Sequence, residues 1–197
     1  MQSKQPNLCL YGGTFDPIHL GHTFIAQNAV KVLNLDKVIF LPCHQSPHKQ
    51  SQSMFSNAQR LELCQLATQN LDWAEVSNFD LSASTPSYSW RTVEHFKKQY
   101  PDSKLYWLMG TDQWQAFPSW ARADYIASMV EIVVYCRDHP PTEHPGFSCI
   151  QIQGYHHPAS ATQIRKQLVS RQKSPWITPD LSTQIKKYCD SGNSPLD

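Results

Sequence analysis

The stretch Leu8-Cys-Leu-Tyr-Gly-Gly-Thr-Phe-Asp-Pro-Ile-His-Leu-Gly-His22 decides the fold of this chain. Its first four residues are apolar and predict a short strand. Residues 23–33, which follow the stretch, carry apolar side chains that lean to one side of a helix. A strand that passes through a glycine-rich loop into a helix is typical of the opening unit of a parallel α/β sheet.

The rest of the chain repeats this alternation. Short apolar runs predict further strands at 37–41, 73–76, 105–109, 130–136 and 149–152. Amphipathic stretches predict helices at 56–70, with Ser56 as N-cap, and at 88–99, 162–170 and 179–189. Strands separated by helices favour right-handed crossovers. We therefore expect an α/β, Rossmann-like, doubly wound parallel sheet of five to six strands with flanking helices. It forms one domain over 1–190, with a C-terminal helical part from about residue 160 and a tail at 191–197.

Composition excludes several classes of protein. The 197 residues are 40% hydrophobic, which is enough for a core and excludes a wholly disordered chain. Seventeen Lys and Arg against sixteen Asp and Glu give a net charge of +1, so no nucleic-acid partner is expected. No apolar run reaches the length of a membrane span, and the polar first residues are not typical of a signal peptide. We expect a cytoplasmic protein with six reduced cysteines, no membrane partner and no dedicated metal site; a homo-oligomer stays open.

The first loop carries the strongest chemical pattern. Gly12 and Gly13 remove side chains where the strand ends, so backbone N–H groups can approach a phosphate. The three-residue spacing of His19 and His22 places both imidazoles on one side of a first helical turn, where the helix dipole adds roughly half a positive charge. The loop lacks the Gly-Lys-Ser/Thr of a P-loop. It predicts a receptor for polyphosphate; a metal-binding pair and simple helix-capping histidines are the alternatives.

This loop resembles the Gly-Gly-Thr-Phe-Asp-Pro-x-His-x-Gly-His signature of bacterial nicotinate mononucleotide adenylyltransferases, within the nucleotidyltransferase superfamily that shares the His-x-Gly-His element. Other segments resemble family motifs in the family's order, from about residue 8 to about residue 170. These are Pro42-Cys-His-Gln-Ser-Pro-His-Lys49, Pro86-Ser-Tyr-Ser89, Met109-Gly-Thr-Asp112, Phe117-Pro-Ser-Trp120 and Ser160-Ala-Thr-Gln-Ile-Arg165.

The resemblance implies a reaction and a set of residues for it. The family joins ATP to nicotinate mononucleotide, releasing pyrophosphate, with Mg²⁺ accompanying the triphosphate. By the resemblance, the catalytic residues are His19, His22 and Arg165. The ATP-binding residues are Gly12, Gly13, Thr14, Phe15, Gly110, Asp112, Ser160 and Thr162. The acceptor-binding residues are His48, Lys49, Ser87, Tyr88 and Trp120, and Arg137 is a weaker candidate for a phosphate contact.

Several of these residues also fit a plainer interpretation. The segment 160–165 fits an ordinary capped surface helix, with Ser160 as its cap, and Asp112 fits a helix N-cap. His48 fits a solvated basic loop. A metal site made by His44 and His48 is disfavoured, because Pro47 between them opposes the helix that would align them.

The chain departs from the family pattern mainly around the acceptor. Ser46 replaces the first of two prolines, Ala121 stands where an aromatic residue is common, and Ala159 stands where a larger hydrophobic residue is usual. Adenylyl transfer is therefore better supported than the identity of the acceptor. Nicotinamide mononucleotide, another small phosphorylated acceptor such as phosphopantetheine, and a non-catalytic nucleotide-binding paralogue remain as alternatives.

Overall fold

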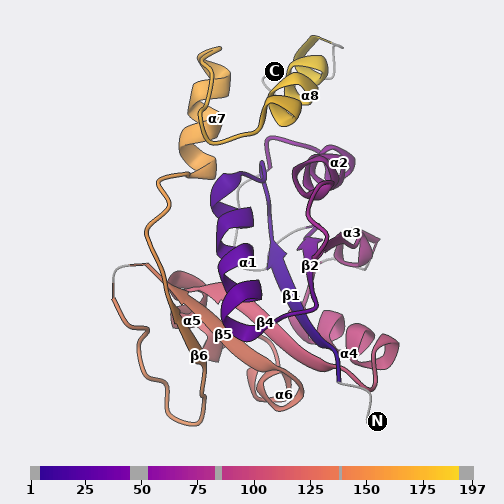
Figure 1. The fold of residues 1–197 in the computed structure, drawn as a ribbon, viewed down its shortest axis with the longest axis vertical. Coiled ribbons are helices and arrows are strands. Elements are labelled where there is room, and N and C mark those ends of the chain that lie inside the picture. Colours follow the sequence, from indigo (N-terminus) through magenta and orange to yellow (C-terminus); the bar gives the residue numbers. More distant parts are fainter. Residues whose placement is uncertain (1–4, 45–52, 83–85, 138, 191–197) are drawn as a thin grey trace.

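The computed structural model describes residues 5–44, 53–82, 86–137 and 139–190. Six parallel strands form one sheet in the order β3-β2-β1-β4-β5-β6 (Figure 1). The strands are β1 (Asn7–Gly13), β2 (Lys37–Pro42), β3 (Ala74–Val76), β4 (Lys104–Gly110), β5 (Glu131–Cys136) and β6 (Ile150–Gln153). This sheet confirms the predicted Rossmann-like, doubly wound fold.

The strand order places a crevice at a defined point of the sheet. The chain starts in the centre at β1, moves outward through β2 to β3, and then crosses back to β4 on the other side of β1. The register pairs Gly13 with Pro42 in β2, and Leu10 with Trp107 in β4. Because the connections after β1 and β4 diverge, ligands of such sheets bind beyond the carboxyl ends of these strands.

Helices cover both faces of the sheet. One core cluster contains residues of α1 (Leu20–Leu33), α2 (Asn57–Thr68), α7 (Ala161–Val169) and α8 (Pro179–Asp190). The other contains residues of α4 (Ser89–Gln99), α5 (Thr111–Ala116), the 3-10 turn η1 (Phe117–Ser119) and α6 (Ala123–Met129). A short helix, α3 (Phe79–Ser82), follows β3. In Figure 1 the helices α7 and α8 stand together at one end of the molecule, opposite the N-terminus.

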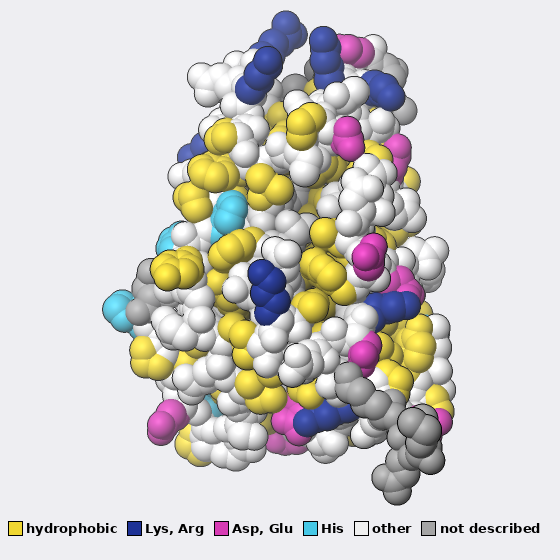
Figure 2. Space-filling view, viewed as in Figure 1, with side chains coloured by type: hydrophobic (Ala, Val, Ile, Leu, Met, Phe, Trp, Pro, Cys, Tyr) yellow, Lys and Arg dark blue, Asp and Glu magenta, His cyan; other side chains and the backbone are white. Residues whose placement is uncertain are grey.

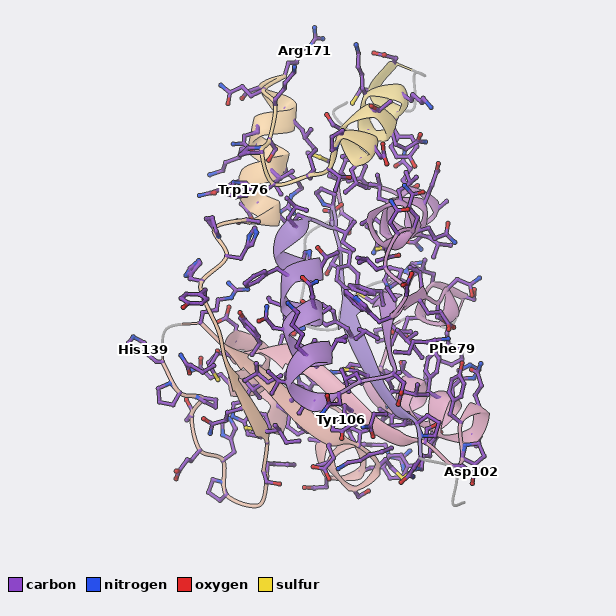
Figure 3. The ribbon with its side chains drawn as sticks, in the orientation of Figure 1. Phe79, Asp102, Tyr106, His139, Arg171 and Trp176 are labelled. Carbon is purple, nitrogen blue, oxygen red and sulfur yellow. The ribbon has the colours of Figure 1, made fainter. Side chains whose placement is uncertain are left out.

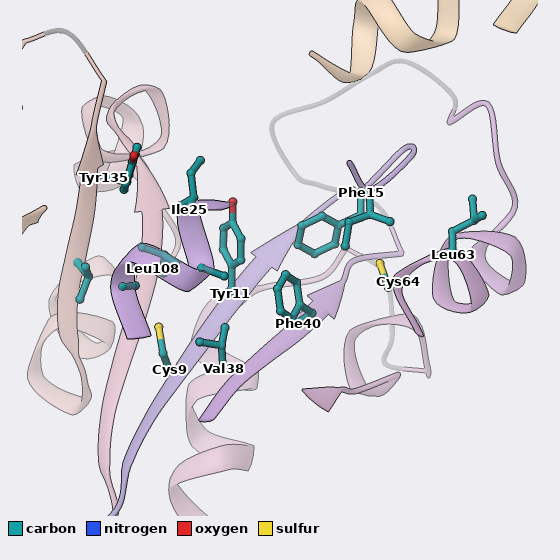
Figure 4. Close-up of a cluster of buried hydrophobic side chains, with 14 of the residues drawn as sticks. Cys9, Tyr11, Phe15, Ile25, Val38, Phe40, Leu63, Cys64, Leu108 and Tyr135 are labelled. Atoms are coloured by element: carbon teal, nitrogen blue, oxygen red, sulfur yellow. The ribbon is translucent and has the colours of Figure 1, made fainter. Parts of the chain in front are cut away.

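The strands alternate between these two clusters, as side chains of successive strand residues must. Cys9 and Tyr11 of β1 face the first cluster, whereas Leu8 and Leu10 face the second. Figure 4 shows the aromatic part of the first cluster, where the Tyr11 and Phe40 rings lie 5.6 Å apart. Burial on both faces explains why the strands are nearly continuous apolar runs in the sequence.

The boundaries of the predicted strands and helices agree with the structure to within three residues, and the capping residues explain where the helices begin. The predicted cap at Ser56 is confirmed, since its Oγ accepts the Gln59 N–H at 3.3 Å and Gln59 Oε1 accepts the Ser56 N–H at 2.9 Å. The first helix begins at Leu20 rather than at Thr23, because His19 caps it. Ser160 stands at the N-cap of α7, but its side chain makes no capping bond, so that expectation is wrong.

Four short helical segments were not expected from the sequence: α3, α5, η1 and α6. Each spans seven residues or fewer, which is too short to establish a helical period. They form because their apolar residues pack onto the sheet. Trp114, Phe117 and Ile126 are each at most 1% exposed in the second cluster.

The C-terminal helices are held to the first helix by the segment that precedes α8. The Leu20 N–H donates to the carbonyl of Trp176 at 2.9 Å, and Trp176 lies near the start of α1 in Figure 3. Ile164 of α7 and Leu181 of α8 belong to the same buried cluster as α1. We propose on this basis that residues up to 190 form a single domain.

Within the described ranges, no helix is both long and apolar enough to cross a bilayer. The face drawn in Figure 2 carries both acidic and basic side chains, and several of the basic ones lie at the end where α7 and α8 stand.

Candidate active site

A cavity of about 1090 Å³ opens at the carboxyl edge of the sheet. Its walls come from the loops after β1 and β2, the start of α4, the segment from Gly110 to Ala121, the end of β5 and the start of α7. Many residues that the sequence singled out line it: Gly12, Gly13, Thr14, Phe15, His22, Ser87, Tyr88, Gly110, Asp112, Trp120, Arg137 and Arg165. Three others, His19, Ser160 and Thr162, are not among its lining residues. His48 and Lys49 lie outside the described residues.

The two histidines of the first loop form one stacked unit. Their ring centroids lie 3.8 Å apart with the planes 26° from parallel. His19 Nδ1 accepts the Gly21 N–H at 3.2 Å, and His22 Nδ1 accepts the His19 N–H at 3.2 Å. The same hydrogen bonds therefore cap the start of α1 and orient both imidazole rings.

This bonding pattern assigns the protons of the two rings. A ring nitrogen that accepts a hydrogen bond carries no proton, so the neutral form of each ring holds its hydrogen on Nε2. His19 is 7% exposed. Burial, aided by the positive charge of His157 and Arg137, lowers the pKa of His19 to about 4. At neutral pH His19 is an uncharged imidazole with an N–H donor at Nε2.

Gly21 permits the tight first turn between these rings. A Cβ at this position would stand 3.1 Å from the His19 ring and 3.3 Å from Cβ of Ala159, in the segment that leads to α7. Any larger residue would push either the imidazole or this segment outward. The glycine therefore lets the α7 segment lie directly against the start of α1.

Phe15 fixes the shape of the loop from the inside. Its backbone has φ 46°, a left-handed conformation that costs free energy in a residue other than glycine. The ring is 2% exposed and lies edge-on to Tyr11 at 5.6 Å and to His22 at 5.0 Å. Burial of the ring offsets the backbone strain, and the contact with His22 supports that imidazole.

Arg165 joins the same loop from the far end of the chain. Its Nη1 donates to the Asp16 carbonyl at 2.7 Å and lies 3.7 Å from Asp16 Oδ2, while Nη2 donates to Thr162 Oγ1 at 3.3 Å. α7 thus carries a guanidinium to a residue only three positions before His19. The structure brings His19, His22 and Arg165 to one loop, although His22 and Arg165 lie 143 positions apart in the sequence.

Asp16 is a residue of this site to which the sequence assigned no role. Its carboxylate accepts the N–H groups of Met54 and Phe55, both at 2.9 Å, and it pairs with Arg165. One buried side chain therefore ties the first loop, the segment before α2 and α7 together. The available signal was an acidic residue inside the glycine-rich loop, but all three partners of its carboxylate are remote in sequence.

A second polar cluster lines the other side of the cavity. Ser87 Oγ accepts the His44 N–H at 3.1 Å and donates to the Asp80 carbonyl at 3.0 Å. Thr92 Oγ1 donates to Asp80 Oδ1 at 2.6 Å, and burial raises the pKa of Asp80 to about 6. Asp80 was missed by the sequence analysis, because it sits on the short helix α3. The cluster orients the start of α4, where Tyr88 makes no side-chain capping bond.

Trp120 is half-buried and lines the same cavity. Its ring meets Trp107 edge-on at 6.2 Å and lies 5.5 Å from Phe117. Two aromatic neighbours hold the indole in place while part of it lines the cavity. Trp120 therefore packs against the second core cluster and also presents part of its ring to the cavity.

The described residues contain no group of three or more His, Cys, Asp and Glu side chains that could hold a metal ion. Asp16 and Asp80 already use carboxylate oxygens in the hydrogen bonds described above. Besides these two carboxylates and Asp112, the lining carries Arg137 and Arg165, whose guanidinium groups can donate hydrogen bonds to an anionic ligand.

Comparison with known proteins gives this geometry a family. A family model described as cytidylyltransferase-like matches residues 10–167. The chain belongs to the cytidylyltransferase-like family. Full-length relatives in this family include a protein of Listeria monocytogenes named probable nicotinate-nucleotide adenylyltransferase, which is 34% identical over 91% of this chain and 94% of its own. The Bacillus subtilis nicotinate-nucleotide adenylyltransferase is 28% identical over 92% of this chain and 94% of its own.

A more similar relative matches a shorter stretch. The probable nicotinate-nucleotide adenylyltransferase of Methylacidiphilum infernorum is 41% identical over 66% of this chain, and the match spans 64% of that relative. Among solved structures, Plasmodium falciparum nicotinic acid mononucleotide adenylyltransferase in complex with APC superposes with a TM-score of 0.74, at 18% identity, over 98% of this chain and 100% of that one. The superposition confirms the fold over nearly the whole of this chain.

Proposed function

We propose that this chain transfers the adenylyl group of ATP to nicotinate mononucleotide, giving nicotinate adenine dinucleotide and pyrophosphate in NAD biosynthesis. One observation carries the proposal: a stacked imidazole pair and an arginine from α7 are fixed to the same glycine-rich loop at the rim of the cavity. Relatives that match over nine tenths of the chain carry the name of this activity.

The reaction is an in-line displacement that needs no covalent enzyme intermediate. A phosphate oxygen of the acceptor attacks the α-phosphorus of ATP, the new P–O bond forms, and the bond to the departing pyrophosphate breaks. The acceptor phosphate is already anionic at neutral pH, so no residue has to remove a proton. Catalysis then consists of positioning and of offsetting charge on the phosphate oxygens.

The histidines supply hydrogen-bond donors for those oxygens. His22 lines the cavity and His19 is stacked behind it. Because each Nδ1 is occupied by a backbone N–H, each Nε2–H is the donor that a phosphate oxygen would meet. A neutral donor held in place is effective here, since it needs no reorganisation as charge moves to the leaving group.

The remaining residues divide between the two substrates. Arg165 offers a planar fork to the leaving phosphates, and the backbone of Gly12, Gly13, Thr14 and Phe15, together with Gly110, Asp112, Ser160 and Thr162, is assigned to ATP. Ser87, Tyr88 and Trp120 are assigned to the acceptor, together with His48 and Lys49 outside the described residues. Mg²⁺ would be held chiefly by the triphosphate and water, and it would neutralise phosphate charge when bound.

The proposal is tested by measuring pyrophosphate release from ATP and Mg²⁺ with each of three acceptors. Nicotinate mononucleotide is expected to give the highest kcat/KM, above nicotinamide mononucleotide and phosphopantetheine. A preference for either of the other two would move the assignment to another acceptor within the same reaction. Release with none of them, alongside measurable ATP binding, would overturn the proposal in favour of a nucleotide-binding protein.

A further inference from the structure

Arg60 of α2 is a buried cation near the cavity to which neither the family motifs nor the proposed mechanism assigns a role. The residue is 0% exposed. Its Nη1 donates to the Thr14 carbonyl at 2.6 Å, and its Nη2 donates to Asn57 Oδ1 at 2.6 Å and to the His44 carbonyl at 3.4 Å. None of the ion pairs found among the described residues involves Arg60.

The two carbonyls that it binds belong to different loops. Thr14 follows β1 and His44 follows β2, and both residues line the cavity. The strands themselves are paired as far as Gly13 and Pro42, and the Cys43 N–H still donates to the Gly13 carbonyl at 3.0 Å. Arg60 continues this link beyond the end of the sheet, through its hydrogen bonds to the Thr14 and His44 carbonyls.

The guanidinium group of Arg60 is suited to linking the two loops. A buried cation without a carboxylate costs free energy, which the protein recovers only by hydrogen-bonding the charged group. The guanidinium is a rigid planar fork that can donate to two carbonyls at once, with Asn57 fixing its rotation. An ammonium group on a flexible stem has no such geometry. Since Arg60 does not itself line the cavity, it acts through the loops that do.

We infer that Arg60 is a positioning residue that holds the loop after β1 and the loop after β2 at a fixed separation. This inference rests on the proposed function, in which the first loop holds ATP and the second lies beside the acceptor. In-line attack requires the two phosphates to meet in near-attack geometry, and a misplacement of about 1 Å costs on the order of a hundredfold in rate. The expected signature is a loss of turnover with little loss of binding.

The experiment compares wild type with Arg60→Lys, which keeps the charge, and with Asn57→Ala, which frees the fork to rotate. Exposed Arg171, at the far end of α7, provides the matched control Arg171→Lys (Figure 3). For Arg60→Lys we expect kcat to fall about a hundredfold, while calorimetric Kd values for ATP and for nicotinate mononucleotide change by less than about threefold. Asn57→Ala is expected to lose about tenfold in kcat.

Each outcome decides the matter. A wild-type kcat in folded Arg60→Lys overturns the inference. A rise in both Kd values together with a fall in the thermal unfolding temperature also overturns it, because that pattern indicates an arginine whose role is only structural. If Arg60→Lys does not fold, the kcat of Asn57→Ala decides in the same way. An inactive wild type would instead overturn the proposed function. If wild type and Arg171→Lys are both active, a result that contradicts the expectation for Arg60→Lys counts against the Arg60 inference alone.

Discussion

The two rims of the cavity are built in different ways. On the rim assigned to ATP, two imidazoles, a strained Phe15 and the start of α1 are held mostly by bonds within the stretch 11–22. On the rim assigned to the acceptor, His44, Asp80, Ser87 and Trp120 come from four segments and meet only in the folded chain.

This difference explains where the sequence analysis succeeds. Local bonds leave a continuous motif, whereas a set of side chains gathered from separate segments leaves scattered short matches. The rim assigned to ATP, called the ATP rim below, also depends on distant segments. Asp16 connects it to Arg165 of α7 and to the segment before α2, and Arg60 of α2 connects to it through the Thr14 carbonyl.

The largest effect is expected from removing an imidazole of the ATP rim. His19→Asn keeps an acceptor for the Gly21 N–H, and so preserves the cap of α1, but it removes the Nε2 donor. Loss of one such donor lowers kcat by about 10²- to 10³-fold. The KM for the acceptor should be nearly unchanged in a steady-state assay of pyrophosphate release. A rise in that KM at constant kcat would place His19 on the acceptor rim.

A somewhat smaller effect is expected at the residue that anchors this rim. Asp16→Asn removes the charge that pairs with Arg165 and weakens the bonds from Met54 and Phe55. We expect kcat to fall about tenfold to a hundredfold as the arginine loses its orientation. Asp102→Asn, at an exposed turn far from the cavity, is the control. Equal kcat values for the two variants would show that the local bonds suffice to hold the ATP rim.

The acceptor rim is tested by Trp120→Ala. Loss of a stacking surface is worth roughly 1–3 kcal/mol, so the acceptor Kd should rise about 5- to 150-fold while the Kd for ATP stays nearly constant. Because the ring also packs on Trp107 and Phe117, the thermal unfolding temperature should fall as well. Trp73→Ala, beside β3, controls for loss of a tryptophan elsewhere. Equal losses for both ligands would assign Trp120 to the core alone.

The smallest expected effect is the pH dependence of stability. The pKa of His19 is about 4 in the folded chain against an ordinary value of 6.5, so the unfolded chain takes up this proton first as the pH falls. Between about pH 6.5 and 4 this residue therefore costs stability. The raised pKa of Asp80 has the opposite effect below about pH 6. Urea unfolding from pH 7 to 4 should show wild type losing more stability than His19→Asn; identical slopes would show that His19 is not desolvated.

Part of the fold was predictable because its cause is local. Apolar runs bounded by turn residues gave the six strands, and a serine followed three residues later by glutamine gave the cap of α2. The short helices between β4 and β5 were not predictable, since packing of Trp114, Phe117 and Ile126 against the sheet, rather than helical periodicity, stabilises them.

The candidate site divides along the same line. The residues assigned to the first loop and to α7 could be named because their motifs are continuous in the chain. The importance of Asp16, Arg60 and Asp80 could not be foreseen, because each has at least one partner that lies 12 to 149 residues away. Ser160 shows the converse, a residue placed at a cap by its sequence but left without a capping bond by the folded structure.

The sequence by itself determined the alternation of strands and helices, the glycine-rich first loop and the spacing of its two histidines, because hydrogen bonds and periodicity over a few residues specify them. Only the tertiary structure decided how deeply His19 is buried, where Arg165 attaches, and how Arg60 links the two loops. Those properties depend on burial and on contacts between segments that only the crossing order of the sheet brings together.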